Sequence, residues 1–118
     1  MRKLTFELPK QRQLEINGAI FDIKKNDTDV IETAMALHNK YTNAINTNAD
    51  FLKKAEMVVG SVREIEAHIN DILGEDAVYK IIGDTPLGVT EAIKLMMFVC
   101  QGVMEEYNAT VAEKYKDD

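Results

Sequence analysis

Leu14-Glu15-Ile16-Asn17-Gly18-Ala19-Ile20-Phe21-Asp22-Ile23 is the stretch that decides the fold of this chain. Asn-Gly between two alternating segments is the strongest short signal for a β-hairpin, because both residues adopt the positive φ of a type I′ turn. In that register Ile16 faces Ala19 and Leu14 faces Phe21. One face of the hairpin is then apolar and consists of Leu14, Ile16, Ala19, Phe21 and Ile23. A lone hairpin is marginal in water, so this face must pack on helices or on another chain.

Upstream of the hairpin, Leu4 and Phe6 could supply a further strand before Pro9. An exposed edge of the hairpin would also invite pairing with another chain. We therefore expect residues 1–25 to form an extended, hairpin-containing region.

Two amphipathic segments follow. Asn26 is a plausible N-cap for the first, and Asp27 and Asp29 place negative charge where the helix dipole favours it. Its apolar stripe is Val30, Ala34, Leu37, Tyr41 and Ala44. The second segment ends at Gly74, a good residue just beyond a helix. Its stripe is Phe51, Ala55, Val58, Val62, Ile65, Ile69 and Ile72.

The two stripes share one heptad register, so a single long helix through residues 46–50 is possible. Residues 43–50 are nevertheless poor in helix formers and rich in turn residues. We favour a break at 46–50, because a small domain buries more apolar surface as a helical hairpin.

The rest of the chain predicts a short helix, a loop and a final helix. Residues 75–82 bury Ala77, Val78, Ile81 and Ile82 and stop at Gly83, and residues 83–88 form a loop. Thr90 or a nearby residue caps the last helix, which runs to about Tyr115. Its expected stripe is Ile93, Met97, Cys100, Met104, Tyr107 and Val111.

These elements predict an α+β fold that is mainly α, with three to four helices packed against an N-terminal β-hairpin. A chain of 118 residues has the commonest size of one domain. We therefore expect a single domain over 1–118, with the hairpin region at 1–25 and the helical region at 26–115.

Charge and composition exclude several partners. The net charge is −6 and the longest basic clusters are pairs, which disfavours both nucleic acid and anionic membrane surfaces. The N-terminus lacks the apolar stretch of a signal peptide, and no apolar run approaches the length of a membrane span. We expect a cytoplasmic protein that binds neither nucleic acid nor membranes.

No pattern of catalytic or metal-binding residues emerges. His38 and His68 each lack a second ligand at helical spacing, and Cys100 lies in an apolar run where a thiol behaves as a small hydrophobe. Adjacent carboxylates such as Glu105-Glu106 point apart on a helix and do not share a site. We expect no enzyme activity, no cofactor and no metal site.

The informative anomaly is the run Leu95–Cys100, six apolar residues that cover the whole circumference of a helix. Such a helix is either central in its domain or in contact with another chain, and the sequence leaves both interpretations open. The residues expected to contact a partner or a second copy are Leu95, Met96, Phe98 and Val99.

Three segments together carry a family resemblance. They are the Leu-x-Ile-Asn-Gly-x-x-Phe-Asp hairpin at 14–22, the run Ile69-Asn70-Asp71-Ile72-Leu73-Gly74-Glu75-Asp76-Ala77, and Lys80-Ile81-Ile82-Gly83-Asp84. This organisation resembles the small tail assembly chaperones of long-tailed phages and prophages of Gram-positive bacteria. The sequence departs from that pattern at Asp76, where a glycine is usual, and at Asn70, one place before Asp71.

The resemblance implies a protein that binds the long, aggregation-prone tape measure protein and helps tail proteins assemble around it in the host cytoplasm. It also implies a noncatalytic protein that is absent from the finished particle, and we expect it to form a homo-oligomer. The alternatives are a structural head-to-tail connector subunit and a bacterial helical regulatory or interaction module.

Overall fold

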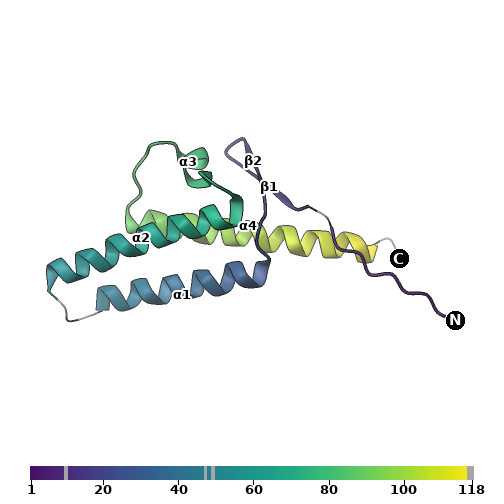
Figure 1. The fold of residues 1–118 in the computed structure, drawn as a ribbon, viewed down its shortest axis with the longest axis horizontal. Coiled ribbons are helices and arrows are strands. Elements are labelled where there is room, and N and C mark those ends of the chain that lie inside the picture. Colours follow the sequence, from purple (N-terminus) through teal and green to yellow (C-terminus); the bar gives the residue numbers. More distant parts are fainter. Residues whose placement is uncertain (10, 47, 49, 117–118) are drawn as a thin grey trace.

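The computed structural model describes residues 1–9, 11–46, 48 and 50–116. This part of the chain contains an antiparallel hairpin, β1 (Gln13–Ile16) and β2 (Ala19–Asp22), followed by four helices. The helices are α1 (Asp27–Asn46), α2 (Phe51–Leu73), α3 (Ala77–Ile82) and α4 (Val89–Lys116) (Figure 1). The fold is α+β and mainly α, which confirms the expected class.

The hairpin has the expected register, with Leu14 opposite Phe21 and Ile16 opposite Ala19. Asn17 and Gly18 take φ values of 51° and 84°, the positive values that the two-residue turn needs. The five apolar residues expected on one face all belong to the core or pack against it. The turn is also anchored, because the Asn17 side chain donates a 3.1 Å hydrogen bond to the carbonyl of Ile81.

The further strand expected around Leu4 and Phe6 does not form. Residues 1–9 contain no strand, and Leu4 is 86% exposed. An extended segment becomes a strand only when a neighbouring edge satisfies its backbone groups, and residues 1–9 run away from the hairpin (Figure 1).

α1 and α2 form an antiparallel pair (Figure 1). α1 ends at Asn46 and α2 begins at Phe51, so the expected break is confirmed, although positions 47 and 49 lie outside the described residues. Both helix starts are capped as the physical rules require. The Asn26 side chain accepts a 2.8 Å bond from the Asp29 amide, and the Asp50 side chain accepts a 2.9 Å bond from the Lys53 amide.

Glycines end the two middle helices, as expected. The amide of Gly74 donates to the carbonyl of Asn70, and that of Gly83 donates to the carbonyl of Tyr79, with φ values of 109° and 68°. Both φ values lie where a side chain would add strain. α3 is shorter than expected and begins at Ala77, where the Asn70 side chain accepts a bond from the Val78 amide.

The last helix begins one residue before the expected cap. Val89 is its first residue and the Glu91 side chain accepts a 3.0 Å bond from the amide of Gly88, so Thr90 lies within the first turn. The expected stripe on this helix is partly wrong. The core face consists of Ala92, Met96, Val99, Cys100 and Val103. Met97 and Met104, expected inside, are exposed, and the Val111 side chain lies outside the described residues.

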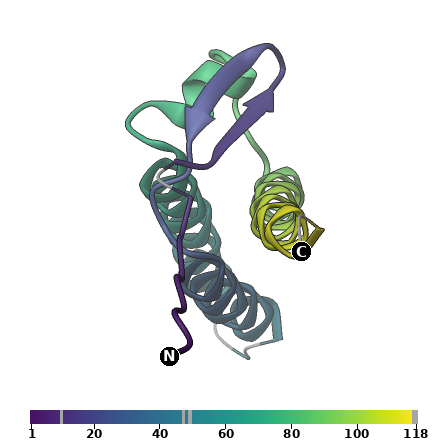
Figure 2. The ribbon, with the colours of Figure 1, turned by 90° about the vertical axis from the view of Figure 1, so that its right-hand side faces the viewer.

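One core draws residues from both strands and all four described helices. Figure 2 shows α4 lying beside the α1–α2 pair, with the hairpin and α3 covering one end of the space between them. The radius of gyration is 17.6 Å, whereas a compact chain of this length has about 13.5 Å. The molecule is therefore elongated, and α4 projects beyond α1 and α2 (Figure 1). No helix in the described ranges is long and apolar enough to cross a membrane.

Candidate functional site

An apolar hollow with a volume of about 500 Å³ lies between α1 and α4. α1 contributes a two-turn stripe and α4 contributes another, and the two helices run antiparallel (Figure 1). The lining residues are Ile31, Ala34, Met35, His38, Asn39, Met96, Met97, Cys100, Gln101 and Met104. We call this hollow the α1–α4 groove.

Methionine dominates the groove. Four of the chain's six methionines line it, at positions 35, 96, 97 and 104. Three of these, Met35, Met97 and Met104, are exposed to solvent. Thioether side chains are flexible and polarizable, so they adapt to apolar partners of differing shape. No described lining residue is Asp, Glu, Lys or Arg. The groove therefore suits an apolar surface, and its polar members are His38, Asn39 and Gln101, the last of which donates a 3.2 Å bond to Glu105.

Cys100 lies on the α4 wall of the groove and is buried. Burial raises the pKa of its thiol to about 11, because the charged thiolate loses water contact. The thiol therefore stays protonated at neutral pH and is a poor nucleophile.

The four residues that the sequence assigned to contact with a partner differ in their exposure to solvent. Met96 is 1% exposed and Val99 is fully buried, so both belong to the core, and Met96 also lines the α1–α4 groove. Leu95 is half-buried against the core. Phe98 is 60% exposed. Met96 and Val99 are buried because α1, α2 and the hairpin enclose that side of α4.

Phe98 lines a second hollow, of about 300 Å³, on the side of α4 that faces β1. Leu14, Glu15 and Ile16 contribute from β1, and Gln101, Gly102 and Glu105 contribute from the next turns of α4. We call it the β1–α4 hollow. Phe98 and Met97 are consecutive residues, yet they line different hollows.

The groove residues of α1 were not anticipated from the sequence. Ile31, Met35 and His38 lie beside the expected α1 stripe rather than on it. Met97 and Met104 were expected inside the core, and their spacing of seven did place them correctly on one side of α4. A methionine on the polar side of an amphipathic helix, as at Met35, was the available signal.

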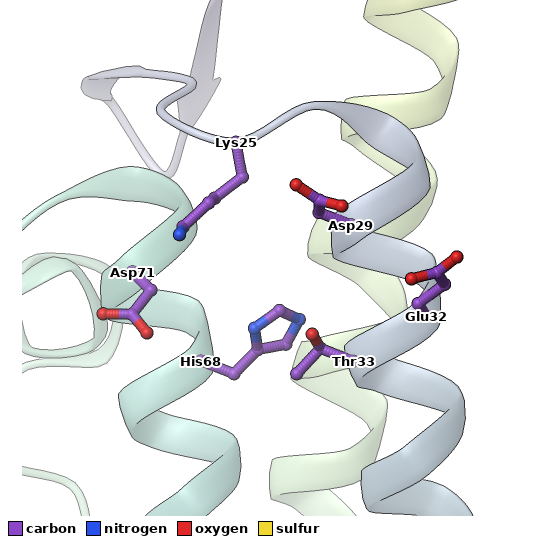
Figure 3. A pocket seen from close by; sticks show the side chains of 6 residues that line it. All are labelled: Lys25, Asp29, Glu32, Thr33, His68 and Asp71. Carbon is purple, nitrogen blue, oxygen red and sulfur yellow. The ribbon is translucent and has the colours of Figure 1, made fainter.

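A third hollow, of about 230 Å³, is polar and lies between α1 and α2 near His68. Lys25, Asp29, Glu32, Thr33 and Asp71 line it with His68 (Figure 3). Figure 3 shows the imidazole between Asp71, which extends from α2, and Glu32, which extends from α1 on the opposite side. The carboxylates are thus spread around the ring rather than gathered on one point.

His68 is buried. Its Nε2 lies 3.2 Å from the carbonyl oxygen of Val30, a contact that requires the hydrogen on Nε2. Burial lowers the pKa of His68, while the Val30 carbonyl and the nearby Asp71 carboxylate partly oppose that shift. His68 is therefore neutral at pH 7 and ties α2 to α1.

Within the described ranges, no group of three His, Cys, Asp or Glu residues is placed to hold a metal ion. Comparison with protein-family models, curated proteins and solved structures found no match to this chain.

Proposed function

We propose that this chain is a noncatalytic protein-binding protein whose α1–α4 groove receives an apolar helix of a protein partner. The observation that carries the proposal is the methionine-lined groove of about 500 Å³ with three exposed methionines on its walls. Exposed apolar surface of this kind on a water-soluble fold is typical of a site that another protein covers.

The shape of the groove favours a helix as the occupant. Its walls are antiparallel two-turn stripes, from Ile31 to His38 on α1 and from Met97 to Met104 on α4. Seven residues of helix rise about 10 Å, so a partner helix of two to three turns matches the walls. Such a helix would present apolar residues at i, i+3, i+4 and i+7 to the methionines, the usual pattern of helix-in-groove recognition.

Within this class, the proposed role is that of a phage tail assembly chaperone. The client would be the tape measure protein, a long helical protein whose apolar stripes need cover before the tail tube encloses them. Adaptable methionine walls suit a site that must accept successive, different stripes. The net charge of −6 would keep the complex soluble.

The test is coexpression with a candidate tape measure protein from a neighbouring gene, followed by size-exclusion chromatography with light scattering. We expect coelution and a larger soluble fraction of the client. Met97→Asp places a charge on the groove wall and is expected to abolish coelution. Insoluble client beside an unaffected chain would contradict the proposal, and recovery of the chain in purified particles would favour a connector subunit.

Two matched variants separate the groove from the rest of the surface. Tyr79 on α3 and Met97 have the same exposure, 59%. Tyr79→Asp therefore adds the same charge at equal exposure but away from the groove, and is expected to leave coelution intact. Phe98→Asp adds it one residue along α4, on the β1–α4 hollow, and is also expected to leave client binding intact. If Met97→Asp, Tyr79→Asp and Phe98→Asp reduced coelution equally, the added charge itself, and not its position in the groove, would explain the loss of binding.

A further inference from the structure

The outer edge of β1 carries backbone groups with no partner strand. The 2.8 Å bond from the Ile23 amide to the Arg12 carbonyl and the register of the hairpin show that Arg12, Leu14 and Ile16 direct their backbone groups toward β2. The groups of Gln13 and Glu15 therefore point away from β2. Within the described ranges, no backbone hydrogen bond reaches them. Such an edge is a template for one more strand.

The β1–α4 hollow lies along this edge and has an apolar lining from Leu14, Ile16 and Phe98. A strand added to β1 would direct alternate side chains into the hollow. Phe98, at 60% exposure, would lose its contact with water. The hollow thus predicts a strand with apolar residues at every second position.

Residues 2–8, which we call the N-terminal arm, have that pattern. Leu4, Phe6 and Leu8 alternate with Lys3, Thr5 and Glu7, and all three apolar side chains are exposed. An extended segment with one apolar face and one polar face is typical of a strand at a sheet edge.

The arm cannot easily reach the edge of its own β1. Arg12 is held at the start of the hairpin, because its carbonyl accepts from Ile23 and its guanidinium lies 3.8 Å from the centroid of the Tyr107 ring. Folding back would leave Pro9-Lys10-Gln11 as the turn. Three-residue hairpin loops use a residue in the left-handed conformation, usually glycine, and this tripeptide has none suited to it.

Opposite charges favour pairing of the N-terminal arm of one copy with the β1 edge of another copy. The arm begins with the terminal amino group, Arg2 and Lys3, whereas Glu15 and Glu105 line the hollow. Opposite charges at the rim of an apolar contact steer association and set its orientation.

We propose that the N-terminal arm of a second copy of this chain adds to the edge of β1 and covers the β1–α4 hollow. Two copies that exchange arms reciprocally satisfy both edges and both hollows, which yields a closed symmetric dimer. This surface meets the α1–α4 groove at Gln101, but its other lining residues are different, so the dimer does not depend on the proposed client.

Sedimentation velocity of the full chain over a range of concentrations tests the dimer. Leu4→Asp in the arm and Phe98→Asp in the hollow are each expected to raise the dimer Kd at least about tenfold, since each loses the burial of a large apolar side chain. Thr5→Asp adds the same charge on the polar face of the arm, and Met97→Asp adds it on the groove wall. Both controls are expected to keep the Kd within about threefold.

Mixing the two defective variants distinguishes exchange between copies from fold-back within one copy. The Leu4→Asp chain keeps an intact hollow and the Phe98→Asp chain keeps an intact arm, so a mixed dimer has one complete contact where each parent has none. We expect the mixture to dimerise more tightly than either variant alone.

Three results would overturn the proposal: a monomeric parent chain up to high concentration, equal effects of all four substitutions, or no gain on mixing. The Met97→Asp and Phe98→Asp variants also separate this proposal from the client-binding one. Each variant is expected to abolish one interaction and retain the other, so the failure of one proposal leaves the other testable.

Discussion

Met96 and Met97 are neighbours on α4 with identical side chains, and the fold gives them opposite roles. Both line the α1–α4 groove, but Met96 is 1% exposed and packs in the core, whereas Met97 is 59% exposed on the groove wall. The difference arises from the roughly 100° between successive residues on a helix. One side of α4 meets α1, α2 and the hairpin, and the other side meets solvent. Apolar character alone therefore does not separate a core residue from a binding residue.

The largest expected effect tests this contrast directly. Met96→Ala is expected to lower the free energy of unfolding by about 2–5 kcal/mol, because it leaves a cavity in the core. Met97→Ala is expected to change it by less than about 0.5 kcal/mol, because the side chain is mostly in solvent. Urea unfolding of both variants, with unchanged m values, measures the difference. Equal losses would show that both sides of α4 are packed in solution.

A second prediction concerns Cys100, which lies at the border between the two sides. Burial raises the pKa of its thiol from an ordinary 9.0 to about 11. At pH 8 the thiolate population, and with it the rate of alkylation by iodoacetamide, should be roughly 100-fold lower in the folded than in the unfolded chain. Mass spectrometry of timed samples, with and without urea, provides both rates. Equal rates would place Cys100 on an open surface.

The smallest expected effect compares two helical glycines. A Cβ at Gly60 in α2 would meet open space, so Gly60→Ala is expected to raise the free energy of unfolding by about 0.5–1 kcal/mol through helix propensity. A Cβ at Gly102 in α4 would lie 3.2 Å from the Leu14 side chain. Gly102→Ala should therefore raise the free energy of unfolding, measured by thermal unfolding, by less than Gly60→Ala does. A larger gain at Gly102 would indicate that β1 packs loosely on α4.

Much of the fold was predictable because short segments carry it. Asn17-Gly18 set the register of the hairpin, and Gly74 and Gly83 marked two helix ends. α2 was equally clear, since its stripe at Ile65, Ile69 and Ile72 is buried as expected and charged residues mark its outer side. Local backbone preferences and a two-sided pattern suffice for such elements.

The candidate site was less predictable. The run Leu95–Cys100 correctly marked the part of α4 that is apolar on both sides, yet two of the four residues chosen from it, Met96 and Val99, are buried. For the α1 wall of the groove, the sequence offered one signal, a methionine at position 35 on the polar side of an amphipathic helix. Met35 and Met97 line one groove because of how α1 and α4 pack, which no local segment encodes.

By itself, the sequence determined most of the elements, the hairpin register, the helix ends and the net charge of −6. These features follow from local backbone preferences and from charge. Only the tertiary structure decided which side of α4 is buried, where the groove lies, and that the N-terminal arm finds no edge within its own chain. An all-apolar helical turn has no polar residues to mark its outer side, so the neighbours that pack against it assign its faces.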